Sequence, residues 1–144
     1  MGGDGQEAVG QRGDARQGGG VLAQISSEMV QAMKHHYGKG PVSAKSYMVD
    51  DLLFVVMRDM ITQAERTMLD AGRGDTVREF RQQFENEVAE MLTRMVERVT
   101  GRRVLTYQSQ VLFDPDITVE IFVFEDQREA DGSDDAAAAV PADQ

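Results

Sequence analysis

The chain has 144 residues, no cysteine and no tryptophan, and a formal net charge of −10. This length predicts one domain, and a negative charge repels phosphate backbones, which argues against general nucleic-acid binding. The absence of cysteine excludes disulfides, thiolate metal sites and cysteine nucleophiles.

Both ends of the chain are poor in large apolar residues. Residues 1–20 contain eight of the 14 glycines, and residues 126–144 combine a run of alanines with six acidic residues. Neither end can bury enough apolar surface to offset the entropy lost on ordering it. We therefore predict a disordered Gly-rich tail over 1–20, a single α+β domain over 21–125 and a disordered acidic tail over 126–144.

The sequence shows neither a secretory signal nor a membrane span. The first apolar cluster begins only at Val21, without the basic start of a signal peptide. The longest unbroken apolar run is residues 52–57, far below the roughly 18 residues that a spanning helix needs. We expect a cytoplasmic protein with no direct insertion into a membrane.

The first part of the middle region predicts a helix followed by a hairpin. Residues 21–37 place apolar side chains at three- and four-residue spacings, as an amphipathic helix does, and Gly38 is expected to end it. The apolar period then changes to two, which predicts strands at 42–49 and 52–57 joined by an acidic turn. Because the second strand is apolar on both sides, we expect both of its faces to be covered.

The second part predicts two helices and another hairpin. Asp59 is expected to cap a helix that a Gly-Arg-Gly break interrupts, and Asp75 to cap a longer helix that ends at Gly101. Strands are predicted at residues 104–113 and 118–125. The order predicts an α+β fold of two similar α-β-β halves, with a four-stranded, mainly antiparallel sheet packed against helices.

Four marks within residues 21–125 point to one family. They are Gly40-Pro41, Asp50-Asp51 before an apolar strand, the helix with Thr62 and Glu65, and Gly101-Arg102-Arg103-Val104 leading to Gln108. In these marks the chain resembles the MpsC family, named for a component of a Na⁺-translocating, membrane-potential-generating system. The resemblance implies a small cytoplasmic accessory protein linked to membrane cation or bicarbonate uptake, and it carries over no catalytic residues.

Polar residues on two of the predicted strands form a candidate ligand site. One strand face holds Ser43, Lys45 and Tyr47, another holds Thr106, Gln108 and Gln110, and two arginines lie nearby. Together these groups could line a pocket for a small anion, or they could be the solvated sides of antiparallel strands. The candidate ligand-binding residues are Lys45, Tyr47, Arg102, Arg103 and Gln108.

The sequence supports metal binding and catalysis less than it supports the candidate ligand site. His35 and His36 are adjacent and so point about 100° apart on a helix, which prevents them from chelating one ion together. The acidic turns at residues 50–51 and 114–116 could attract Mg²⁺ or Ca²⁺ if the halves are related, but they lack EF-hand spacing. No nucleophile elbow or phosphate loop is present. We predict a non-enzymatic protein with no metal and no cofactor.

The leading functional prediction is an accessory or regulatory protein that acts through protein contacts. Two apolar sets alternate along residues 52–57 and 118–125, so one face should meet a second copy if helices cover only the other. The expected partners are a homodimer or higher homo-oligomer and a membrane-transport complex, with no nucleic acid. The alternative is a small-ligand sensor that binds an anion or a nucleotide.

Overall fold

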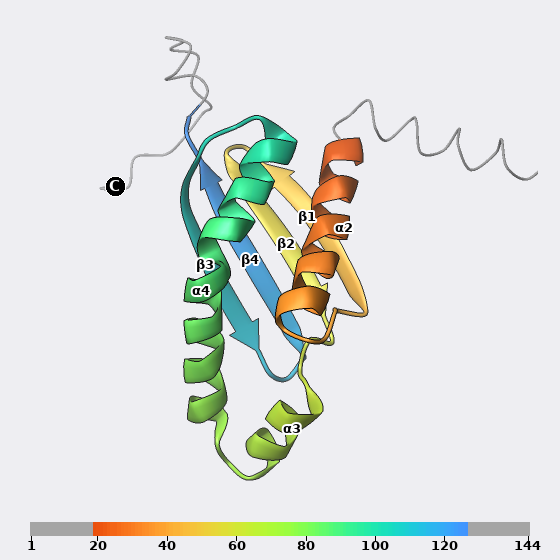
Figure 1. Ribbon diagram of the computed structural model, residues 1–144, viewed down its shortest axis with the longest axis vertical. Helices are drawn as coiled ribbons and strands as arrows, with labels where there is room; N and C mark the ends of the chain where they lie inside the picture. The colour runs from red at the N-terminus through yellow and green to blue at the C-terminus, as the bar shows by residue number, and fades with distance from the viewer. Residues whose placement is uncertain (1–18, 127–144) are drawn as a thin grey trace, which may run out of the picture.

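Residues 19–126 are described by a computed structural model, and they form three helices and a four-stranded sheet (Figure 1). The elements are α2 (Gly19–His36), β1 (Ser43–Val49), β2 (Leu52–Arg58), α3 (Gln63–Asp70), α4 (Gly74–Thr100), β3 (Val104–Leu112) and β4 (Ile117–Phe124). Helix α2 takes in the last two residues of the predicted N-terminal tail. The rest of both predicted tails, Asp126 excepted, lies outside the described residues.

Two hairpins build the sheet, and they meet where β2 pairs with β4. The strand order is β1-β2-β4-β3 and every neighbouring pair is antiparallel. In one row across the sheet, Tyr47 lies opposite Phe54, Phe54 opposite Ile121, and Ile121 opposite Gln108. Because successive side chains of a strand point to opposite faces, these four lie on one face. The predicted α+β class with an antiparallel sheet is confirmed.

Helices α2 and α4 lie over the same face of the sheet (Figure 1). The core forms between them and the strand residues that point toward the helices. Its fully buried members are Ile25, Met29, Leu53, Val55, Met57, Leu92, Val96 and Phe122. Burial of each large apolar side chain contributes about 1.5–3 kcal/mol, so this layer holds the helices on the sheet.

The predicted start of α3 at Asp59 is wrong. The N-cap is Thr62, whose side chain accepts the amide of Glu65 while the Glu65 carboxylate accepts the amide of Thr62. This capping box satisfies amides at the helix start, so the helix begins at Gln63. Asp59 instead has a φ of +62° in the connection after β2.

The boundaries of α4 agree with the prediction at one end only. Its N-cap is Arg73 rather than Asp75, which lies in the first turn where a carboxylate favours the helix dipole. Gly101 ends the helix in the left-handed conformation at a φ of +71°. No Cβ atom would clash there, so the glycine is required by its backbone angle alone.

The expectation that β2 is covered on both faces is wrong for the described residues. Both α-β-β segments place their long helix on the same face of the sheet (Figure 1), so among residues 19–126 no helix lies over the other face. The similarity of the two halves stays a prediction, because the order helix, strand, strand occurs twice but α3 precedes only the second long helix.

Candidate functional site

The sheet face without helices has an apolar centre. Seven partly exposed apolar side chains of β2 and β4 alternate with buried core residues: Leu52, Phe54, Val56, Ile117, Val119, Ile121 and Val123. Val49 of β1 and Leu112 of β3 extend the patch at its margins, 53% and 48% exposed. We call this surface the open face. These residues form one contiguous apolar surface rather than scattered exposed side chains.

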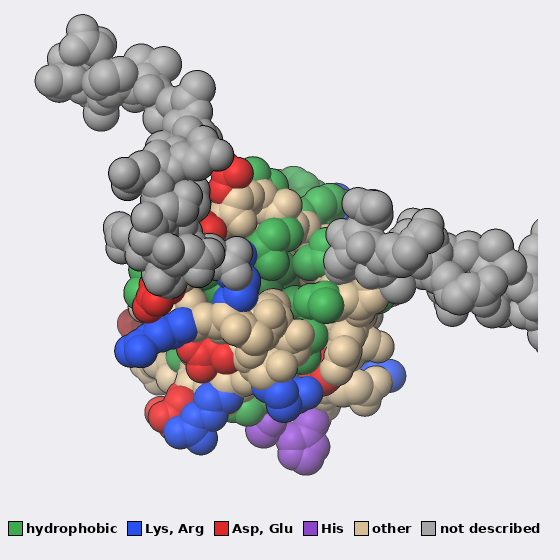
Figure 2. Space-filling model, turned by 90° about the horizontal axis from the view of Figure 1, so that it is seen from above, with side chains coloured by type: hydrophobic (Ala, Val, Ile, Leu, Met, Phe, Trp, Pro, Cys, Tyr) green, Lys and Arg blue, Asp and Glu red, His purple; other side chains and the backbone are tan. Residues whose placement is uncertain are grey.

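The charge distribution separates the open face from the helix side. Figure 2 shows hydrophobic side chains gathered in the half of the view away from the histidines of α2, and most charged side chains in the half that holds them. The outward positions of the four strands include two basic residues, Lys45 and Arg58, and no acidic one. Carboxylates are therefore kept off the open face of a strongly acidic chain.

Three of the predicted ligand-binding residues lie on the open face. Lys45 and Tyr47 are neighbours on β1, with the Lys45 Nζ 5.5 Å from the centre of the Tyr47 ring. Gln108 lies on β3 at the other edge, three strand spacings of about 4.8 Å away. The structure therefore places them in two polar rims on either side of the apolar centre, an arrangement typical of protein interfaces.

The two predicted arginines lie elsewhere. Arg102 Nη2 lies 2.6 Å from Asp51 Oδ1, and its guanidinium stands 4.5 Å from the centre of the Phe124 ring. Its charge is thus paired within the chain, where it ties the start of β3 to the β1–β2 turn. Arg103 is exposed, and its carbonyl accepts the amide of Glu125. The five predicted residues do not converge on one anion.

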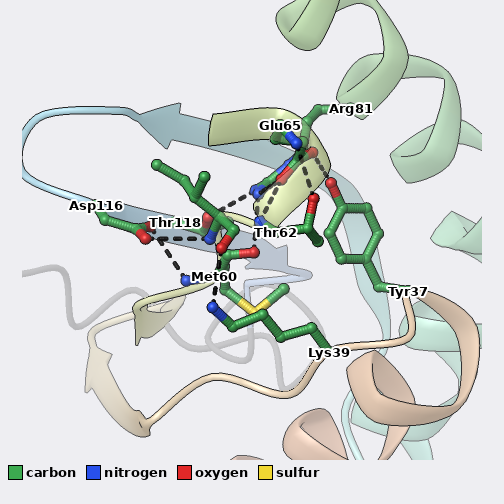
Figure 3. Close-up of polar contacts among 9 residues, drawn as sticks. Tyr37, Lys39, Met60, Thr62, Glu65, Arg81, Asp116 and Thr118 are labelled. Atoms are coloured by element: carbon green, nitrogen blue, oxygen red, sulfur yellow. Dashed lines mark hydrogen bonds and ion pairs between the residues drawn. The ribbon is translucent and has the colours of Figure 1, made fainter. Parts of the chain in front are cut away.

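A buried ion pair lies where α3, α4 and β4 meet (Figure 3). The Nε and Nη2 atoms of Arg81 donate to the two oxygens of Glu65, each at 2.7 Å. Arg81 also donates to the Met60 carbonyl and the Thr118 hydroxyl. The Tyr37 hydroxyl donates to Glu65, and its ring lies 4.8 Å from the guanidinium carbon. Such a bidentate pair is strong and geometrically specific, so it clamps α3 onto α4.

The acidic turns are structural connections at opposite ends of the sheet. Asp116 accepts the amides of Met60 and Ile61, each at 3.1 Å, and Lys39 donates to the Ile61 carbonyl (Figure 3). The carbonyl of Asp51 accepts an amide at the far end of β4. The four carboxylates therefore do not meet, and residues 19–126 contain no group of three metal-ligating side chains.

Two buried carboxylates lie one helical turn further along, Glu85 on α4 and Glu120 on β4. Glu85 and Glu120 are 7% and 2% exposed. The Ser109 hydroxyl donates to Glu85 at 2.7 Å, and the Tyr107 hydroxyl donates to both oxygens of Glu120, at 2.9 and 3.1 Å. These contacts place two carboxyl groups in the interface between α4 and the sheet, and the charge of Arg81 acts on both.

The surroundings of these carboxylates change their acidity. Burial raises the pKa of Glu120 to about 7, with the Glu85 charge adding to the increase and the hydrogen bonds from Tyr107 opposing it. Burial also raises the pKa of Glu85, and burial beside Glu120 raises the pKa of the Tyr107 hydroxyl. Glu120 therefore exchanges a proton near neutral pH.

Several cavities border the buried polar residues, and two of them are larger than the third. One of about 410 Å³ lies among α2, α3 and α4, with Tyr37, Phe80 and Phe84 in its wall beside Glu65. The other, about 290 Å³, lies between α4 and β3 and is bordered by polar side chains that include Glu85. The first cavity is large enough for a small planar ligand. Its apolar wall with a few polar groups is also typical of ligand sites.

The buried charged residues were not predicted as candidate site residues from the sequence. Arg81 and Glu85 continue, at four-residue spacing, the buried stripe of α4 that Val88 also joins, and Glu120 shares the strand phase of Phe122. The available signal was therefore a charged residue at a position where the periodicity requires an apolar one.

Comparisons with known proteins identify relatives of this chain. The family described as "Na+-translocating membrane potential-generating system (MpsC)" matches residues 18–126. "Uncharacterized protein YbcI" of Bacillus subtilis (strain 168) is 23% identical over 94 residues, which cover 65% of this chain and 76% of that protein. No solved structure matches the chain. Within residues 19–126, no helix has the length and apolar character to cross a bilayer.

Proposed function

The chain belongs to the MpsC family, and on that premise we propose that it is a non-enzymatic accessory component of a Na⁺-translocating membrane system. It acts from the cytoplasm through protein contacts and has a regulatory role in cation or bicarbonate uptake. The family description supports the link to a membrane system, and the chain itself serves as a homo-oligomeric partner rather than as the ion path.

The open face carries this proposal. Its centre is apolar, its rims are polar, and it is free of carboxylates, which are features of interface cores and rims. In a chain that works alone in water, polar residues are expected at the outward positions of β2 and β4, because an uncovered sheet face is normally polar. We therefore propose that this surface contacts another protein.

Affinity capture from native cells, with the membrane fraction retained, tests the proposal. The tagged chain is expected to retain an identified subunit of an ion-uptake complex. The variant Val42→Lys, which alters a valine that is 76% exposed outside the strands, should retain it too. Recovery of no ion-transport subunit, from membranes in which the complex is detectable, would contradict the proposal.

The cavity among α2, α3 and α4 favours a second candidate function, a small-ligand sensor. Aromatic rings from Tyr37, Phe80 and Phe84 around about 410 Å³ suit a planar group such as a nucleobase. Thermal melting with a panel of nucleotides, bicarbonate, phosphate and divalent cations tests it. A ligand at 100 times its Kd adds about 2.7 kcal/mol to the free energy of unfolding, and Phe80→Ala should remove the shift. Unchanged melting across the panel contradicts this function.

A further inference from the structure

We propose that the open face is the interface between two copies of this chain, packed sheet against sheet. The inference rests on the proposed function, in which this face makes the protein contact, and it names the partner. Two sheets in a sandwich pack about 10 Å apart with their strands within about 30° of each other. A second copy would cover the apolar centre of the open face with the same residues from its own centre.

The segments outside the described residues are poor candidates for covering this face. Residues 1–18 and 127–144 contain three apolar side chains larger than alanine or proline, namely Met1, Val9 and Val140. The open face has seven in its two central strands alone. Alanine and glycine bury little apolar surface against isoleucine, leucine, phenylalanine and valine, so these two segments are poorly suited to cover the face.

The size of the face matches what a stable dimer needs. Strands β2 and β4 have 7 and 8 residues, or about 25 Å at about 3.3 Å per residue, and four strands span about 19 Å. The flat area of the face is therefore about 500 Å², not counting the surface that protruding side chains add. Two copies together would remove about 1,000 Å² from water, which reaches the threshold for a specific interface.

The rims make the face complementary to itself. The strand order β1-β2-β4-β3 means that a two-fold axis lying between the sheets, parallel to the strands, places β1 of each copy against β3 of the other. Lys45 and Gln110 lie in the same row of the sheet, so the lysine of one copy meets the amide of the other. Apolar β2 then meets apolar β4, and no carboxylate is brought against another. This self-complementarity is what an isologous dimer requires.

Light scattering on the full chain tests the proposal. The expected mass at high micromolar concentration is twice the 15.9 kDa of one chain. Val119→Lys, at the centre of the open face, should give a single-chain mass with unchanged circular dichroism, whereas the matched control Val42→Lys should stay dimeric. A wild-type mass of one chain overturns the proposal, as does a dimer that a folded Val119→Lys leaves intact.

Cross-linking provides a measurement that does not depend on the folding of Val119→Lys. Because the chain has no cysteine, Lys45→Cys and Gln110→Cys can be mixed and treated with a flexible bismaleimide. We expect the mixture to give a cross-linked dimer, and Lys45→Cys mixed with Glu87→Cys on α4 to give none. Equal cross-linking of both mixtures, or of neither, overturns this packing.

The two proposals fail in different ways. If the wild type is a single chain but Val119→Lys loses a membrane partner that Val42→Lys retains, the partner of the open face is that protein and the dimer is wrong. If the chain is dimeric through the open face but retains no ion-transport subunit, the dimer stands and the proposed function is wrong.

Discussion

Glu120 is a carboxyl group at a strand position where its neighbours Phe122 and Phe124 are apolar and buried. The free-energy cost of burying this group is reduced by the Tyr107 hydroxyl, which donates to it, rather than by a salt bridge. Because a buried carboxylate without a paired cation favours the neutral form, the protonation of Glu120 couples the stability of the fold to pH.

The pH dependence of folding should therefore depend on Glu120. Its pKa rises from 4.5 to about 7 in the folded chain, so between these values the folded state holds a proton that the unfolded state releases. The free energy of unfolding falls as pH rises through this window, by about 3 kcal/mol, and Glu85 acts in the same direction.

Urea unfolding at pH 5 and pH 8 measures this effect. The difference in the free energy of unfolding between the two pH values should be much smaller for Glu120→Gln than for the wild type. The same change at exposed Glu87 should leave the difference as in the wild type; a wild-type pH difference in Glu120→Gln would refute this account.

The buried ion pair should be costly to break from one side. Arg81→Met leaves the carboxylate of Glu65 buried without its cation, and we expect a loss of about 3–5 kcal/mol in the free energy of unfolding. The control Arg94→Met removes an exposed pair with Glu90 and should cost less than about 1 kcal/mol. Adding Glu65→Gln to Arg81→Met should restore part of the loss. Urea denaturation measures all three, and equal losses for Arg81→Met and Arg94→Met would show that the pair is not structural.

At the scale of elements, α3 is an eight-residue helix, too short to be stable by itself. It is held by the capping box at its start and by the Glu65–Arg81 pair, and its preceding connection is held by Asp116 of the β3–β4 turn. The position of α3 over the cavity wall thus depends on residues distant in the sequence.

Removal of the N-cap should loosen α3 selectively. Thr62→Ala deletes the side chain that accepts the Glu65 amide, and we expect a loss of about 1 kcal/mol with faster amide exchange in Gln63–Asp70. Thr67→Ala in the same helix removes only an exposed hydroxyl bond to the Gln63 carbonyl. If the two variants exchange alike, the capping box does not determine the stability of this helix.

At the scale of the whole molecule, the core that the structure describes within residues 19–126 extends from Ile25 to Phe124. We therefore expect a chain shortened to residues 19–126 to fold as the full chain does, because the removed segments are poor in apolar side chains. Its melting temperature should lie within about 4 °C of the full chain, the change that roughly 1 kcal/mol produces in a domain of this size. A larger decrease in thermal melting would place structural contacts outside these boundaries.

Local patterns were sufficient for the class and order of the elements. The period of two predicted all four strands within one residue of their ends, and Gly101 was identified as the end of α4. These features depend on side chains a few positions apart, whose spacing is written directly in the sequence. The MpsC resemblance, confirmed over residues 18–126, likewise rests on such short marks.

The tertiary structure decided what depends on distant pairings. The connection after Asp59 is not helical, because Asp116, more than 50 residues later, binds its amides. Lys45 and Gln108 lie at opposite edges because β2 pairs with β4, and strand order is not encoded in any single strand. The burial of Glu120 and the exposure of the open face follow from which side of the sheet the helices cover. Alternation along a strand shows that two faces differ, but only packing shows which one meets the helices.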